Sequence, residues 1–176
     1  MIKDKELLPE DIFWYVARTR HGQELKVRDT LLTCGVEHFI PTTVAQRERK
    51  GRRVCVQVPL IPNMVFVRST QKDALSLVNG RGVPMYYIID HSTGRMLIVP
   101  PKQMDDFIRV ITQDPATLCT EIPEIPLGAD VRITAGSLEG VEGRVIMLPN
   151  RTYVLVSVGH LLCAKVQVPR ACVRCI

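Results

Sequence analysis

Leu60-Ile61-Pro62-Asn63-Met64-Val65-Phe66-Val67 is the stretch of sequence that decides how the first half of the chain folds. Its Pro-Asn pair predicts a turn, and the apolar and β-branched residues after it predict a strand. The strand is expected to begin after the proline, which has no backbone N–H. Because side chains alternate between the two faces of a strand, the methionine and the phenylalanine share one face and the two valines share the other. The valine face suits a core covered by helices.

The opposite face of this strand has two interpretations. If it is open, Met64 and Phe66, with Ile61 beside the turn, form an apolar docking patch, and methionine is the residue type that adapts to a partner surface. If both faces are covered, all of these residues belong to the core. The residues alone leave both interpretations open.

The composition bounds the class of protein. The 176 residues favour one domain or two small ones, and 46% of them are hydrophobic, which is enough for a core. No apolar run is long enough to span a bilayer, and the charged residues 1–6 do not resemble a signal peptide, so a cytoplasmic protein is expected. The formal net charge of +5 favours a polyanionic partner.

The six cysteines are scattered and several lie in apolar runs, as Cys55 and Cys163 do, which indicates reduced thiols and not a disulfide framework. Cys172 and Cys175 form a single C-x-x-C with no second pair, and alternate strand positions explain this spacing better than half a zinc site. We expect no cofactor and no metal.

The segment 13–112 alternates strands and helices. Residues 13–19 predict a strand, residues 23–34 a helix that Gly35 ends, and residues 43–58 a hairpin with a basic tip at 47–53. Thr70 and Asp73 resemble a capping box for a helix with Ala74, Leu75 and Val78 inward. Strands at 85–90 and 95–99 precede a helix that begins at Pro101 and carries apolar residues at helical spacing. The apolar face of that last helix consists of Met104, Phe107, Ile108 and Ile111.

This order predicts an α+β fold in which helices pack on an antiparallel sheet. The prolines in 113–126 then predict a linker, and residues 127–176 consist of short strands and turns that predict a small β-barrel. Gly136, Gly140 and Gly143 are expected to relieve backbone strain at its turns and corner. We therefore expect a leader over 1–12 and two domains, 13–112 and 127–176.

Two groups of motifs resemble a known family. Trp14-Tyr15-Val16, Gly22-Gln23-Glu24, Phe39-Ile40-Pro41 and the stretch 59–67 are similar to the N-terminal domain of NusG-type transcription elongation factors. Gly128 to Ile133, followed by Gly136 to Val145, resembles a KOW motif. The Pro-Asn pair and the basic hairpin tip are closer to specialised NusG paralogues of the RfaH type, and closer still to those that antiterminate long polysaccharide operons.

The resemblance implies a ferredoxin-like N-terminal domain and an SH3-like C-terminal barrel. It also implies that the N-terminal domain grips the clamp helices of RNA polymerase and suppresses pausing or termination, and that the protein acts as a monomer. The polymerase-binding positions that match the family are Tyr15, Ile61, Met64 and Phe66. Met64 departs from the pattern, since the family usually has tyrosine there.

In the RfaH type, polar and basic residues contact the exposed non-template DNA strand. The positions that match, together with the basic hairpin tip, give the expected nucleic-acid-binding set: Arg20, His21, Gln23, Lys26, Ser76, Asn79, Arg81, Arg49, Lys50, Arg52 and Arg53. Arginines at such positions pair with phosphates, and Asn79 is placed to read a base edge. For His21 a solvated turn residue, and for the hairpin tip a solvated loop, are the alternatives.

The barrel is implied to recruit a ribosomal protein or a termination factor through Ile133 and the turn at Leu138. An RNA-binding or ribosome-associated KOW protein is the alternative function. The chain has no G-x-S-x-G, no H-E-x-x-H and no P-loop, so an enzyme is not expected. The alternating valines in 154–168 favour a barrel that does not refold into helices.

Overall fold

The computed structural model describes residues 11–49, 51–119, 128–149 and 151–176. Contacts within the chain divide it between Val99 and Pro100 into two compact units. Among the described residues, none of the helices has the length and apolar character needed to cross a bilayer. The expected leader, apart from residues 11 and 12, lies outside the described residues.

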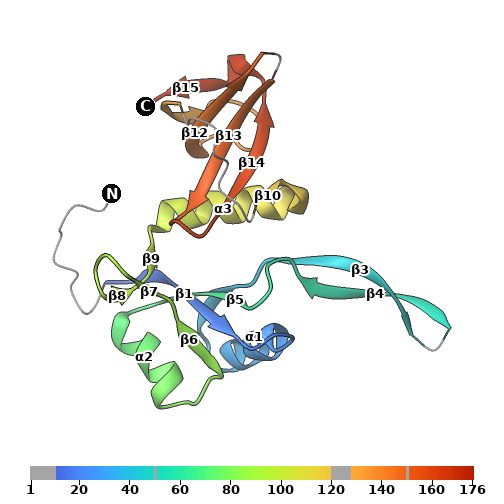
Figure 1. Cartoon of the computed structure of the whole chain (residues 1–176), viewed down its shortest axis with the longest axis vertical. Helices are drawn as coiled ribbons and strands as arrows, with labels where there is room; N and C mark the ends of the chain where they lie inside the picture. Colours follow the sequence, from blue (N-terminus) through green and yellow to red (C-terminus); the bar gives the residue numbers. More distant parts are fainter. Residues whose placement is uncertain (1–10, 50, 120–127, 150) are drawn as a thin grey trace. The chain divides into compact units, whose positions relative to one another are not determined.

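The first unit is built on an antiparallel sheet (Figure 1). The strands run in the order β2-β5-β1-β6, and β9 pairs with β1 beyond this path. Their bounds are Phe13–Thr19 for β1, Glu37–Phe39 for β2, Met64–Ser69 for β5, Met85–Tyr87 for β6 and Ile98–Val99 for β9. Strand β5 begins directly after the Pro-Asn turn, as predicted, and lies between β2 and β1 at the centre of the sheet.

Helices α1 (Glu24–Thr33) and α2 (Gln71–Asn79) supply the core on one face of this sheet. Val27 and Leu31 of α1 and Leu77 of α2 form one buried cluster with Val65 and Val67 of β5. The predicted helix-covered valine face is therefore confirmed. Helix α1 ends where glycine was expected to stop it, because Gly35 has a φ of 68°, a left-handed conformation that glycine adopts without strain.

Helix α2 confirms its predicted cap and corrects its predicted inner face. The Thr70 hydroxyl accepts a hydrogen bond from the Asp73 N–H at 3.2 Å. Ala74 and Leu77 are the buried residues of the helix, whereas Leu75 is 43% exposed. Leu77, one helical turn after Ala74, makes the inward contact that the sequence analysis assigned to Leu75.

Two hairpins extend from the first unit. Strands β3 (Thr42–Arg49) and β4 (Arg52–Pro59) form the long predicted hairpin, and β7 (Ile89–Asp90) and β8 (Arg95–Met96) form a short one. In β3–β4, Thr42 lies opposite Pro59 and Arg49 opposite Arg52, so the pairing reaches the tip in register. Gly51 at the tip has a φ of 73°, which this tight connection requires.

The second unit combines helix α3 (Pro101–Gln113) with an antiparallel six-stranded sheet in the order β10-β14-β13-β12-β11-β15. The strands are Leu118–Cys119 for β10, Asp130–Ile133 for β11, Glu142–Leu148 for β12, Arg151–Val158 for β13, Leu162–Val168 for β14 and Val173–Cys175 for β15, with short 3-10 turns at Pro115–Thr117 and Arg170–Cys172. Val154, Val156 and Val158 are buried in β13, and so is Leu155 between them. A sheet with helices plus a β-rich second unit confirms the predicted fold class.

Part of the expected linker is structured, and helix α3 packs within the second unit. A 3-10 turn and β10 occupy residues 115–119, and β10 pairs with β14; residues 120–127 lie outside the described part of the chain. The sequence predicts this helix as the last element of the N-terminal domain, whereas in the structure α3 contacts β13 and β14. Met104, Phe107, Val110 and Ile111 are its buried apolar residues.

Candidate functional site

The Pro62-Asn63 turn is fixed by two backbone hydrogen bonds at the end of the central strands. The Asn63 N–H donates to a carboxylate oxygen of Glu24 at 2.8 Å, and the Asn63 carbonyl accepts from the Thr19 N–H at 3.0 Å. Glu24 is only 2% exposed, although it is the first residue of α1. Asn63 has a φ of 63°, and asparagine is one of the few residue types that adopt this left-handed conformation.

The four predicted polymerase-binding residues are all buried. Met64 is 6% exposed and Phe66 is fully buried, so the open apolar patch is absent from this structure. Tyr15 and Ile61 are buried as well. The structure matches the interpretation in which both faces of β5 are covered, and the expectation of an exposed patch is wrong for this conformation.

The strand register separates Tyr15 from the other predicted residues. Tyr15 lies opposite Val67, and residues directly opposite in antiparallel strands share a face, so Tyr15 is on the valine side. There its ring packs edge to face against Tyr87, with centroids 6.0 Å apart. Burial raises the pKa of both hydroxyls, and the negative charge of Asp11 adds to the effect on Tyr15. Both rings are therefore neutral at physiological pH.

The face that carries Phe66 includes residues that the sequence analysis did not assign to a site. Val16 and Phe39 both lie opposite Phe66 in the register, and the Phe39 and Phe66 rings have centroids 6.3 Å apart. Trp14 shares this face of β1 by alternation and is 3% exposed. The alternation within residues 13–19 was visible in the sequence, but it identifies these neighbours only once the register between β1 and β5 is known.

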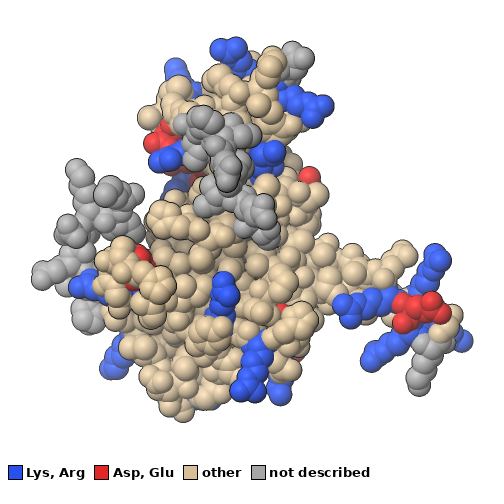
Figure 2. All heavy atoms as spheres, in the orientation of Figure 1, with Lys and Arg blue, Asp and Glu red and all other residues tan. Residues whose placement is uncertain are grey.

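The basic hairpin tip is exposed, as predicted. Arg49, Arg52 and Arg53 are exposed, and Lys50 lies outside the described residues. Figure 2 shows arginine side chains gathered near the end of the β3–β4 hairpin around an acidic group. Glu48 is paired with Arg53 in the strand register. The tip offers several exposed cations to solvent, a suitable arrangement for phosphates.

The remaining predicted nucleic-acid-binding residues fall into two groups. Arg20, His21 and Lys26 are exposed beside the start of α1, where Gln23 is the N-cap residue. Ser76, Asn79 and Arg81 are exposed on α2 and directly after it. A pocket of about 600 Å³ in the first unit brings Ser76 and Arg81 together with Arg68, and its lining includes none of the first group.

The predicted partner surface of the barrel is buried too. Ile133 is fully buried and Leu138 is 7% exposed, so an exposed apolar edge at these residues is corrected. The guanidinium of Arg109 on α3 donates to the carbonyls of Ser137 at 3.1 Å and Glu139 at 2.9 Å, on either side of Leu138. Helix α3 thus holds the turn that the sequence analysis expected to be free.

Comparisons with known proteins identify the family. The family model described as "Transcription termination factor nusG" matches residues 13–108, more than half of the 176-residue chain. A solved structure described as "Domain interaction in Thermotoga maritima NusG" is 20% identical, with a TM-score of 0.47 over 94% of this chain and 98% of that one. No curated protein matches the sequence. The chain belongs to the NusG family of transcription factors.

Proposed function

We propose that this protein is a transcription elongation factor that binds RNA polymerase through its N-terminal domain and suppresses pausing and termination. The observation that carries the proposal is the family match over residues 13–108, which includes every strand of the first sheet. The protein then acts by binding alone, without a catalytic step of its own. Within the family, the Pro62-Asn63 pair and the basic hairpin favour the specialised RfaH type.

The proposed polymerase contact is the sheet face that carries Met64 and Phe66, with the clamp helices as the partner. Both helices of the first unit, α1 and α2, contribute to the core on the opposite, valine-bearing face. From a conformation in which Phe66 is exposed, burying it against a partner contributes about 2 kcal/mol. Because Phe66 has no exposed surface in this structure, binding requires a conformation in which its face becomes accessible.

The proposed nucleic-acid contacts are electrostatic. Arg49, Arg52 and Arg53 at the hairpin tip, and Arg20 and Arg81 at the ends of helices, are exposed cations. Their partner is the phosphate backbone of the displaced non-template DNA strand. Binding of this kind weakens steeply with salt, because each neutralised phosphate releases counterions. The second domain is proposed to recruit a ribosomal protein or a termination factor.

Affinity measurements with RNA polymerase test the proposal, with Phe66→Ala compared with Val67→Ala. Both residues are fully buried on β5, but they point to opposite faces. Loss of the Phe66 ring is expected to weaken polymerase binding roughly thirtyfold, the equivalent of about 2 kcal/mol. Val67→Ala is expected to leave the affinity of the folded protein unchanged, and Trp14 fluorescence checks that each variant is folded.

If Phe66→Ala and Val67→Ala bound RNA polymerase with equal affinity, the Phe66 face would not be the polymerase contact. RNA binding that survives while polymerase binding is absent would favour the alternative function, an RNA-binding or ribosome-associated KOW protein.

A further inference from the structure

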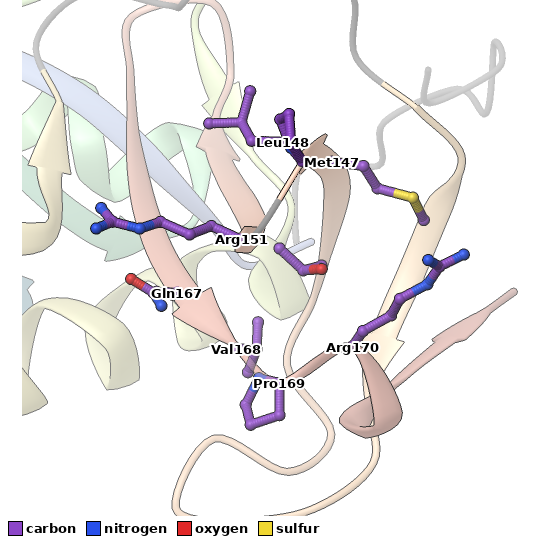
Figure 3. Close-up of a pocket in the computed structure, with 9 residues that line it drawn as sticks. Met147, Leu148, Arg151, Gln167, Val168, Pro169 and Arg170 are labelled. Atoms are coloured by element: carbon purple, nitrogen blue, oxygen red, sulfur yellow. The ribbon is translucent and has the colours of Figure 1, made fainter.

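The second unit has a pocket at the end of its sheet that the proposed function does not use (Figure 3). Its volume is about 480 Å³. The end of the β12–β13 hairpin contributes Met147, Leu148 and Arg151, and the end of β14 with the following turn contributes Val168 and Arg170. The pocket does not include Ile133 or Leu138 of the expected partner surface.

The apolar part of the pocket continues the interior of the sheet. Met147 lies opposite Thr152, and Thr152 lies opposite Val168, so the three side chains share one face. Thr152 and Val168 are buried, but Met147 at the end of β12 is 58% exposed. Leu148 beside it is 42% exposed. By alternation Leu148 points to the other face, where it lies opposite Arg151, so Met147 is the exposed apolar side chain on the face of Thr152 and Val168. Methionine packs against varied surfaces.

The charged part of the pocket is entirely positive. Arg151 and Arg170 are exposed, and none of the residues that line the pocket is acidic. Arg151 has one hydrogen bond, to the Tyr153 hydroxyl at 3.5 Å, and neither arginine forms an ion pair within the described residues. In Figure 3 the two guanidinium groups extend to opposite sides of the pocket, Arg151 in the direction of Gln167 and Arg170 in the direction of Met147.

This arrangement distinguishes between two classes of anionic partner. A nucleic acid binds single-stranded sites through aromatic rings on which its bases stack, and no aromatic residue lines the pocket. The nearby Tyr153 ring is already covered by the Lys165 ammonium, 4.7 Å from its centroid. A peptide that carries both carboxylates and apolar side chains matches both parts of the surface, since arginine pairs with carboxylates through two parallel hydrogen bonds.

We propose that this pocket binds an extended acidic segment of a partner protein, in which an apolar side chain lies between two carboxylates. The apolar side chain packs on Met147, and the carboxylates pair with Arg151 and Arg170. The site extends the protein's interactions beyond the polymerase contact, because it lies on the second unit and shares no residue with the Met64 face.

The test uses the full chain labelled with ¹³C at its methionine methyl groups and three synthetic peptides. The first alternates glutamate and leucine, the second replaces glutamate by glutamine, and the third replaces leucine by serine. We expect the first peptide to shift the Met147 methyl signal saturably and each of the other two to bind about tenfold more weakly. Absence of a saturable shift with the first peptide would overturn the proposal.

Two double variants distinguish peptide binding at this pocket from non-specific electrostatic attraction. The double variant Arg151→Gln/Arg170→Gln is expected to weaken binding of the first peptide about tenfold. The matched control Arg144→Gln/Arg174→Gln removes the same charge from exposed residues outside the pocket and is expected to leave binding unchanged. Equal loss in both double variants would contradict the proposed site. A single-stranded oligouridylate that shifts Met147 at equal or lower concentration than the peptide would assign the surface to nucleic acid instead.

Discussion

The buried carboxylate of Glu24 accepts a hydrogen bond from the backbone N–H of Asn63 at 2.8 Å, across 39 residues of sequence. This bond ties the first residue of α1 to the turn that precedes the central strand β5. A carboxylate at the start of a helix is also stabilised by the helix dipole. The pair therefore fixes where β5 begins, and with it which side chains of β5 lie on each face.

Replacing Glu24 by alanine is expected to destabilise the first unit by about 1–3 kcal/mol, because the partly buried Asn63 N–H loses its acceptor. Glu24→Gln keeps an amide oxygen there and is expected to cost less. Urea denaturation followed by Trp14 fluorescence measures the change, since Trp14 is the one tryptophan in the sequence and lies in the first unit. Glu37→Ala, at an exposed ion pair with Arg68, is the control. If Glu24→Ala cost no more than this control, the bond would not hold the turn.

A second buried carboxylate joins helix α3 to the sheet of the second unit. Asp106 is 2% exposed, accepts a hydrogen bond from the Glu142 N–H at 3.0 Å and pairs with Lys102. Asp106→Ala is expected to cost about 1–3 kcal/mol and to speed hydrogen exchange at the Glu142 amide. Its neighbour Asp105 is exposed, so Asp105→Ala is a matched control on the same helix. Equal exchange at Glu142 in both variants would contradict the contact.

Gly143 lies where the backbones of β12 and β13 approach closely. A Cβ atom at this position would be 2.4 Å from the Leu155 carbonyl oxygen and 2.8 Å from a methyl carbon of Val154. Gly143→Ala is therefore expected to destabilise the second unit by about 1–3 kcal/mol. In contrast, Gly136 has open space around it, so Gly136→Asn adds the backbone strain of a φ of 91° but no clash, and is expected to cost less than Gly143→Ala. Hydrogen exchange at the β13 amides compares the two variants, and equal protection would show that the close approach has no cost.

Cys163 gives the second unit a dependence on alkaline pH. Burial, together with the neighbouring Cys119, raises the pKa of the Cys163 thiol from 9.0 to about 11. A thiol whose pKa is raised on folding stays protonated in the folded state, so its contribution is fully present below pH 9 and is lost as pH rises through 11. Stability measured by hydrogen exchange should fall between these values.

The control for this pH dependence is Cys163→Ala. The stability of the second unit in this variant is expected to fall less steeply over the same pH range. Iodoacetamide at pH 8 should modify the exposed Cys55 and Cys175 before Cys163. Rapid alkylation of Cys163 in the folded protein would contradict its burial.

The elements of this fold follow from local sequence signals. The Pro62-Asn63 turn, the glycine after α1 and the Thr70 cap each set a boundary through the chemistry of one or two residues. These signals act between neighbours in sequence, so they can be found without knowledge of the tertiary structure.

The candidate site could be predicted less completely, because its geometry depends on distant pairings. Alternation separated Phe66 from Val67, but the register with β1 puts Tyr15 on the valine side, and nothing within residues 13–19 indicates that register. Leu138 is buried between two carbonyls that accept hydrogen bonds from Arg109 on α3, nearly 30 residues earlier in the chain. Turns rich in glycine and charge are usually exposed, and in this one Leu138 is buried although Ser137 and Glu139 on either side of it are exposed.

In-vitro transcription by RNA polymerase over a long template tests the central claim most directly, with pause lifetimes and read-through of a terminator measured with and without the protein. The account predicts shorter pauses and more read-through with the wild-type chain and with Val67→Ala, and a weaker effect with Phe66→Ala. Pause lifetimes and read-through that do not change when the wild-type protein is added would contradict it.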